Sequence, residues 1–174
     1  MKRMVMALVG LLFAGPVAAE EANCMTDMVT AFEGALMAGN LDGIMGLYVD
    51  SNDVLVVEST GKVRRGREGI RAMYGDAFAE ATWTKADFEL IKTDLGDDEG
   101  FCFFRFAARG TLKGGTDEFA LNVQGTWLVR NTKTGWKIFH EHMSPTDAVP
   151  RLEIIKTEAE AEAEAEPESP SPQD

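Results

Sequence analysis

The spacing of apolar residues changes in type along the chain. In its first part, apolar residues recur at intervals of three and four, which predicts amphipathic helices. After residue 81 the chain is rich in branched and aromatic residues, and Gly- and Asn-rich loops of hairpin length interrupt it, which predicts strands. The expected helices are 26–38, 41–48 and 66–79, and the expected strands are 54–57, a short partner around Val63, 82–95, 101–112, 118–130 and 136–144.

This order of elements predicts the fold class α+β. Helices followed by a run of antiparallel strands favour a cone-shaped curved antiparallel sheet wrapped around three N-terminal helices. Such a cone has an open mouth and an apolar interior. We therefore expect any small-molecule site to lie inside it.

The first residues have the features of an export signal. Lys2 and Arg3 precede an apolar run over 4–14, and Gly15-Pro16 is followed by small residues. The run is shorter than the ~20 residues needed to span a bilayer. We expect a signal peptide over 1–19, cleavage near Ala19 and a periplasmic or secreted mature protein.

The last residues are acidic and repetitive. A Glu-Ala repeat lies within 151–174, and its like charges have no apolar face to dock, so this segment is expected to be a disordered tail. The intervening residues 20–150 are expected to form one domain. The whole chain has a formal net charge of -12 and a pI near 4.6, which disfavours nucleic acid and membrane surfaces as partners. Its two Cys and two His exclude a thiolate zinc centre, and we expect neither metal nor cofactor.

Three short motifs occur in the order found in a known family. They are Ala-Gly-Asn-Leu-Asp at 38–42, Arg-Gly-Arg-Glu at 65–68 and Trp-x-x-x-His-x-His-x-Ser at 136–144. With these motifs, residues 25–144 resemble the SnoaL-like group of the nuclear transport factor 2-like superfamily. The resemblance implies the cone fold and a homodimer. Members of this superfamily include isomerases, cyclases, dehydratases and kinase association domains.

The resemblance extends to ketosteroid isomerase. It places Glu58 where that enzyme has its carboxylate base, and an apolar cone would raise the pKa of such a carboxyl. It also places Phe32 where the isomerase has an oxyanion-stabilising Tyr. Asn122 and Gln124 are the nearest candidates for a second donor, so isomerisation of steroids is not expected.

The segment 101–106 resembles a strand of the calcium/calmodulin-dependent kinase association domain. That similarity implies that Arg105 is a pocket arginine, whereas Gly125 and Met143 occupy the other two arginine positions. Arg105 can bind a ligand carboxylate through a bidentate pair of hydrogen bonds, or it can neutralise Glu58 in a buried ion pair.

Strand alternation separates the side chains of the His-Glu-His string. His140 and His142 share one face with Trp136 and Ile138, and Glu141 lies on the other. The histidines could ligate a metal with a third group from another strand, or act as an acid–base pair with His142 catalytic and His140 binding ligand. Alternatively, they could hydrogen-bond within the sheet or at a subunit interface. Under the kinase-domain resemblance, Glu141 is the residue that points at the cavity.

Two aromatic residues and a pair of cysteines are further candidates. Tyr48 and Trp83 are candidates to line the mouth, where they offer a polar group and an aromatic wall. Cys24 precedes the first helix and Cys102 lies on a strand that wraps it. In an oxidising compartment these cysteines are expected to form a disulfide.

Two functions fit these residues. The first is a small-molecule-binding or association domain, exported and homodimeric, that holds a small apolar molecule with a carboxylate or carbonyl group near Arg105. The second is an enzyme of the isomerase, cyclase or dehydratase type, in which Glu58 or a histidine is the general base. Neither function requires a cofactor.

Overall fold

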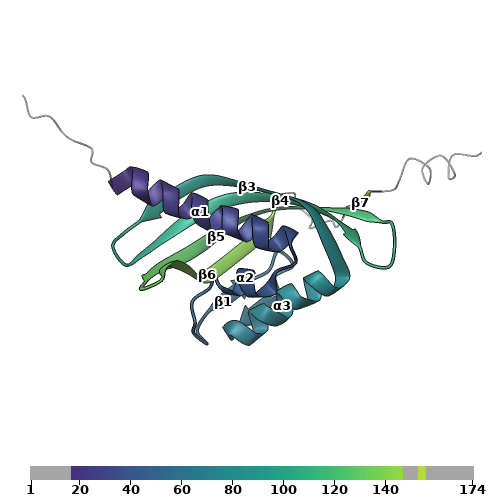
Figure 1. Ribbon diagram of the computed structural model, residues 1–174, viewed down its shortest axis with the longest axis horizontal. Coiled ribbons are helices and arrows are strands. Elements are labelled where there is room, and N and C mark those ends of the chain that lie inside the picture. Colours follow the sequence, from purple (N-terminus) through teal and green to yellow (C-terminus); the bar gives the residue numbers. More distant parts are fainter. Residues whose placement is uncertain (1–16, 147–152, 156–174) are drawn as a thin grey trace, which may run out of the picture.

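Helices cover one face of a curved sheet in the computed structural model (Figure 1). The structure describes residues 17–146 and 153–155, and the side chains of residues 24–146. Its helices are α1 (Val17–Met37), α2 (Leu41–Met45) and α3 (Gly66–Glu80). Its strands are β1 (Leu55–Val57), β2 (Val63–Arg65), β3 (Ala81–Leu95), β4 (Glu99–Leu112), β5 (Glu118–Thr132), β6 (Gly135–Pro145) and β7 (Glu153–Ile155).

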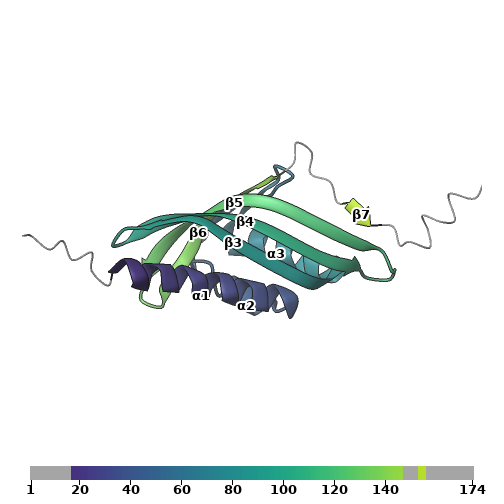
Figure 2. The same cartoon turned by 90° about the horizontal axis from the view of Figure 1, so that it is seen from above.

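The described strands form one sheet in the order β2-β1-β6-β5-β4-β3, and β7 pairs with β5. The long strands β3 to β6 follow one another as hairpins and curve together (Figure 2). β1 runs parallel to β6, so the sheet is mixed rather than wholly antiparallel as expected. β1 pairs with the edge of β6 that β5 does not occupy, and it runs in the same direction as β6. The hairpin partner of β1, strand β2, pairs with the other edge of β1.

The predicted helices and strands are present, with changes at their ends. α1 begins at Val17 rather than at residue 26, so its first residues belong to the predicted signal peptide. Residues 1–16 lie outside the described residues. α2 ends at Met45 instead of residue 48, and its start is capped by Asn40, whose Oδ1 accepts a hydrogen bond from the amide of Gly43 at 2.9 Å. Glu153–Ile155, part of the expected tail, pair with Glu118–Ala120 as β7, and 156–174 lie outside the described residues.

The core lies between the helices and the inner face of the sheet. α1 packs against β3, and α3 packs against β1, β2 and β3. Along β4, the residues at 102, 104, 106 and 108 are buried and those between them are more exposed, as a sheet with one covered face requires. Among the described residues, no helix is long and apolar enough to cross a membrane.

Candidate functional site

Aromatic rings line the inner face of the sheet. They come from α1, β3, β4 and β5, and neighbouring ring centroids are 4.7 to 6.1 Å apart. The rings are those of Phe32, Phe88, Phe104, Phe106 and Trp127. Any polar group placed among them is removed from water, so its interactions are electrostatically strong.

Glu141 is the one charged side chain in the described part of the chain that is fully buried, with 1% of its surface exposed. It lies on β6 directly opposite Trp127 of β5. The indole Nε1 of Trp127 donates a hydrogen bond of 3.0 Å to the Glu141 carboxyl. The pairing of β5 with β6 therefore places an acidic group among the aromatic rings.

Two tyrosines complete the surroundings of this carboxyl. Tyr48, which follows α2, donates its hydroxyl proton to the second oxygen of Glu141. The same hydroxyl lies 3.0 Å from the hydroxyl of Tyr74, which α3 contributes. We call Glu141, Tyr48, Tyr74 and Trp127 the Glu141 cluster.

Burial changes the protonation of the Glu141 cluster. Loss of water raises the pKa of Glu141, and the hydrogen bonds from Tyr48 and Trp127 oppose this rise only in part. Burial, together with the charge of Glu141, also raises the pKa values of Tyr48 and Tyr74 well above the usual tyrosine value, so both hydroxyls stay protonated. The cluster combines two hydroxyl donors with a carboxyl that holds its proton more tightly than an exposed glutamate does. Such a set can donate hydrogen bonds to a carbonyl oxygen or exchange a proton with a bound molecule.

Arg67 of α3 holds the chain that carries Tyr48. Its guanidinium donates to the carbonyl oxygens of Met45, Tyr48 and Val49 at 3.1 to 3.3 Å. Arg67 and Tyr48 both line a hollow of about 540 Å³ that also borders Arg130 and Lys137 of the β5–β6 hairpin. Arg67 is thus a positioning residue, because it fixes the backbone from which Tyr48 reaches Glu141.

Replacing Arg67 by Ala is expected to lower the free energy of unfolding by about 2 kcal/mol, because three carbonyl groups lose a charged donor. The change would also loosen Tyr48 and thereby alter the fluorescence of Trp127. Urea unfolding followed by tryptophan emission measures both effects. The matched control is Arg71→Ala on the same helix, where the exposed pair with Asp42 contributes less than about 1 kcal/mol. Equal losses in the two variants would contradict the positioning role.

A family model for the SnoaL-like domain matches residues 25–148. The chain belongs to the SnoaL-like family. The match includes every residue of the Glu141 cluster, so the site lies within the family domain. A search of curated proteins found no match.

Solved structures share the nuclear transport factor 2-like fold of this SnoaL-like domain. A ketosteroid isomerase-like protein from Erwinia carotovora atroseptica is 17% identical, with 74% of this chain and 98% of that chain covered and a TM-score of 0.63. A proposed dehydratase of the NTF2-like family from Streptomyces avermitilis is 19% identical, with 75% and 99% covered and a TM-score of 0.64. A proposed calcium/calmodulin-dependent protein kinase type II association domain from Thiobacillus denitrificans is 18% identical, with 70% and 94% covered and a TM-score of 0.56. At these identities the similarity establishes the fold.

In the SnoaL-like domain, Glu58 lies beside the Glu141 cluster rather than within it. It follows β1 and pairs with the guanidinium of Arg64, and both side chains are 19% exposed. Its charge contributes to the raised pKa of Tyr74, though less than burial and Glu141 do. The pairing with Arg64 replaces the expected pairing of Glu58 with Arg105.

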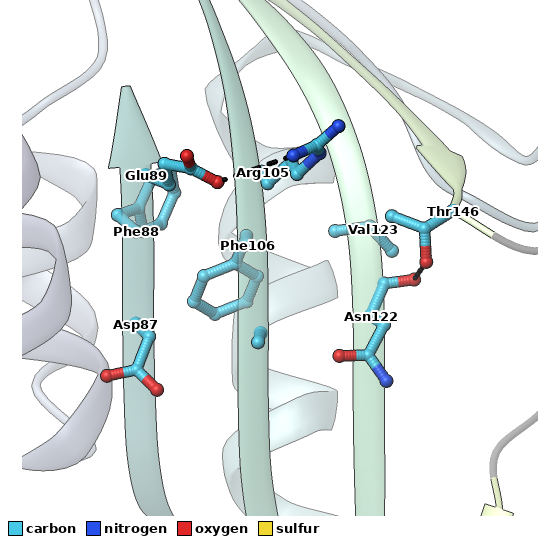
Figure 3. Close-up of a pocket in the computed structure, with 9 residues that line it drawn as sticks. Asp87, Phe88, Glu89, Arg105, Phe106, Asn122, Val123 and Thr146 are labelled. Atoms are coloured by element: carbon cyan, nitrogen blue, oxygen red, sulfur yellow. Dashed lines mark hydrogen bonds and ion pairs between the residues drawn. The ribbon is translucent and has the colours of Figure 1, made fainter. Parts of the chain in front are cut away.

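Arg105 is on the outer face of the sheet, which corrects its expected place in the cone. Its neighbours Phe104 and Phe106 enter the core, so alternation turns Arg105 outward, where its side chain is 62% exposed and 3.6 Å from Glu89. Figure 3 shows Arg105 and Glu89 directed toward each other at an outer hollow of about 430 Å³, which Asn122 also borders. An apolar interior ligand therefore has no contact with this arginine.

The two histidines are also outside the interior. They alternate with the buried Glu141, and His140 is half-buried whereas His142 is exposed. Burial and the neighbouring charge of His142 lower the pKa of His140. Neither histidine can serve as a base inside the cone, and no group of three metal-binding side chains occurs in the described part of the chain.

A register shift in β6 alters the face of both expected neighbours of the histidines, Trp136 and Ile138. Val129 pairs with Ile138 and Leu128 pairs with His140, so Phe139 is an additional residue on β6. Ile138 is therefore fully buried in the same core as Glu141 instead of sharing the face of the histidines.

The remaining candidates have clear positions. Trp83 of β3 is half-buried and packs edge-on against Phe119 of β5 with ring centroids 5.1 Å apart. Cys102 is a free thiol at the centre of the core, where burial raises its pKa to about 12. The structure therefore does not contain the expected disulfide between Cys24 and Cys102, both of which it describes. Cys102 instead packs as a small apolar residue beneath Trp127, its partner on β5.

Proposed function

We propose that this domain binds a small, largely apolar molecule with a carbonyl group, and that the Glu141 cluster contacts the carbonyl oxygen. The observation that carries the proposal is the buried carboxyl of Glu141 joined to two tyrosine hydroxyls within an aromatic interior. An apolar surface with a few convergent polar groups is the usual form of a small-molecule site. The ligand would displace part of the present contacts, since hydroxyl hydrogens can turn toward a new acceptor.

The charges near the cluster favour a neutral carbonyl over a carboxylate. Arg105 is on the outer face, and Arg64 is engaged by Glu58. A ligand carboxylate would approach Glu141 without a cation to offset the repulsion. A ketone, aldehyde, ester or amide oxygen needs only donors, which Tyr48 and Tyr74 supply.

A second candidate function is proton transfer next to the carbonyl of the bound molecule. It is favoured by the raised pKa of Glu141, which suits a general acid or base better than an exposed carboxyl does. In this reading Glu141 replaces Glu58 as the base. Tyr48 and Tyr74 stabilise the developing oxyanion. Their hydroxyls take the role of the tyrosine that ketosteroid isomerase has at the position of Phe32.

We also propose that the protein is exported after cleavage near Ala19 and that it forms a homodimer. The basic and apolar residues at the start of the sequence support export. Dimerisation is supported by the family resemblance. Native mass spectrometry of the protein purified from its exporting host measures the mature mass, the number of subunits and any retained organic ligand.

The binding test uses 4-acetylbiphenyl, an apolar ketone, titrated calorimetrically into the purified protein. Tyr74→Phe is expected to weaken binding about tenfold, because one donor to the ketone oxygen is lost. Glu58→Gln is the matched control and should leave the affinity within about twofold. If Tyr74→Phe binds the ketone as the unmodified protein does, the proposed site is wrong.

Glu141→Gln separates binding from catalysis. Gln keeps the shape of Glu and still forms hydrogen bonds, but it cannot accept a proton as a base. An enzyme is expected to lose turnover of carbonyl substrates by about 10²-fold or more while its affinity stays similar. A binding domain has no turnover to lose, so affinity is then the only property that the same variant can alter.

A further inference from the structure

The hollow of about 540 Å³ beside the segment that follows α2 gathers basic side chains from three elements. Arg67 comes from α3, Arg130 from β5 and Lys137 from β6, and Asp50 is the one acidic residue among the described residues that line it. The whole chain has a formal net charge of -12, so a hollow lined mainly by cations differs from the rest of the molecule. The proposed carbonyl site does not use these cations as ligand contacts.

Two of the three cations are held in place by neutral groups. Nη1 of Arg67 donates to three backbone carbonyl oxygens within 45–49, and the ammonium group of Lys137 donates to the carbonyl oxygen of Gly46 at 2.6 Å. Carbonyl acceptors fix the positions of these side chains without cancelling their charges. Elsewhere on the molecule, the basic residues that pair with carboxylates include Arg64, Arg71 and Lys85.

The carboxylates near the hollow oppose its charge only weakly. An oxygen of Asp50 lies 3.3 Å from Nε of Arg67, but the Asp50 side chain is 95% exposed, so water and salt screen this pair. Glu99 accepts hydrogen bonds from Nε and Nη2 of Arg130 through one oxygen, and both side chains of this pair are about half exposed. The hollow therefore keeps a local excess of positive charge.

Each of the three cations also has donors to spare. Among the described residues, Nη2 of Arg67 and Nη1 of Arg130 make no hydrogen bond, and the ammonium group of Lys137 makes one of the three that it can donate. These donors reach the hollow from three different elements. A bound anion could thus accept hydrogen bonds from several sides while the present contacts of the cations stay in place.

We infer that this hollow binds an oxyanion of the phosphate class. A phosphate group carries close to two negative charges at pH ~7, and its oxygens can accept charge-assisted hydrogen bonds from several directions. Met45 and Val49 add apolar walls, and the volume exceeds that of a phosphate ion, so a phosphate monoester with a small apolar group fits as well as the free ion. The inference does not depend on carbonyl binding at the Glu141 cluster.

Three anions test the chemistry of this site in calorimetric titrations at about 0.15 M NaCl without a phosphate buffer. They are inorganic phosphate, phenyl phosphate and benzoate. The protein is expected to bind phenyl phosphate about tenfold more tightly than benzoate, which has the same ring but one negative charge. Tighter binding of phenyl phosphate than of inorganic phosphate would identify an ester as the preferred form, and equal or weaker binding would identify the free ion. If neither phosphate binds, or if benzoate binds as tightly as phenyl phosphate, the inference is wrong.

Substitutions in the β5–β6 hairpin locate the binding. Lys137→Gln is expected to weaken the binding of phenyl phosphate about tenfold, because a charged donor is lost. Lys133→Gln is the matched control, since it removes the same charge from the same hairpin at a residue that does not line the hollow, and the affinity should stay within about twofold. Equal weakening by both substitutions would mean that only the overall charge matters, and it would overturn the inference.

Arg130→Gln provides a second variant on another strand in case Lys137→Gln lowers stability. It is also expected to weaken phenyl phosphate binding about tenfold, and unchanged affinity in both variants would contradict the proposed site. In ¹⁵N–¹H spectra, the backbone amides of 46–51 and 132–137 should shift most on addition of phenyl phosphate. Shifts confined to other segments would contradict it too.

The phosphate site and the Glu141 site can fail independently. Lys137→Gln should leave the affinity for 4-acetylbiphenyl within about twofold, and Tyr74→Phe should leave the affinity for phenyl phosphate within about twofold. Loss of ketone binding alone in Tyr74→Phe supports the carbonyl site, and loss of phosphate binding alone in Lys137→Gln supports the phosphate site.

Discussion

Glu141→Ala is expected to lower the free energy of unfolding by about 3 to 5 kcal/mol near neutral pH. The substitution leaves a cavity among the aromatic rings, and it removes the acceptor from both Trp127 and Tyr48. Urea unfolding followed by circular dichroism measures the loss. A decrease below about 1 kcal/mol would show that the carboxyl is not enclosed as described.

Glu141→Gln is expected to be tolerated far better and to reveal the protonation of the site. Its amide can accept from Trp127 and donate to Tyr48, which in turn donates to Tyr74, so each buried group keeps a partner. The variant also removes the cost of a buried charge, and its stability near neutral pH should equal or exceed that of the unmodified protein.

The difference in stability between the unmodified protein and Glu141→Gln is expected to depend on pH, and the raised pKa of Glu141 determines the sign. The pKa of Glu141 is raised in the folded state above its usual value of 4.5, so folding favours the protonated form. The contribution of Glu141 to stability is therefore complete below the unfolded pKa, and it is lost as pH rises through the folded pKa. The unmodified protein should be most stable relative to Glu141→Gln near pH ~4, and this advantage should decrease toward pH ~8. An advantage that grows with pH would contradict the raised pKa.

Gly125→Ala is the second substitution with a large expected effect, a loss of about 2 kcal/mol or more. An added Cβ would lie 2.6 Å from the Phe104 ring and 2.7 Å from the backbone carbonyl of His142. The ring cannot move away without disturbing Trp127, whose ring centroid is 4.9 Å away. Thermal and urea unfolding measure the loss.

Gly34→Ala in α1 is the matched control for Gly125→Ala. Apart from its chain neighbours and the backbone of its own helix, no described atom lies within 4 Å of the Cβ that this substitution adds. Ala has the higher helix propensity, so the control is expected to stabilise the protein by about 0.5 to 1 kcal/mol. If both substitutions changed stability in the same direction, crowding beneath Phe104 would not explain the effect of Gly125→Ala.

The order of helices and strands is predictable from the sequence, because periodicity reports which side of each element is buried. The same order of elements predicted a curved sheet around the helices, and the family resemblance implied the same fold. The parallel pairing of β1 with β6 could not be predicted in this way, since local alternation does not specify which strand edge a short segment joins. The early start of α1 was also not predicted.

The position of Arg105 was open to prediction from its own strand. The segment 102–108 alternates buried and exposed residues, and this alternation turns residue 105 outward when Phe104 and Phe106 enter the core. The expectation of an interior arginine came from resemblance to another family member. Here the local pattern was the better guide, because burial of two aromatic rings stabilises the fold more than one exposed ion pair does.

The Glu141 cluster was only partly visible in the sequence. Alternation separated Glu141 from His140 and His142, but it did not decide which face is covered by helices. Tyr48 is 93 residues from Glu141 and 26 from Tyr74, and a contact at such separations depends on the full fold. The pairing of Trp127 with Glu141 depends on the additional residue Phe139, which shifts β6 by one position relative to the register that the hairpin loop sets, and local alternation does not predict that shift.

The central claim is that Glu141 is the polar end of an interior ligand site. ¹³C NMR titration of the carboxyl groups in glutamate-labelled protein, with Glu141→Gln to identify the signal, tests it directly. We predict that Glu141 titrates above the usual range of glutamates and that 4-acetylbiphenyl shifts both its resonance and its midpoint. A midpoint at the usual value with no response to the ketone would contradict the account.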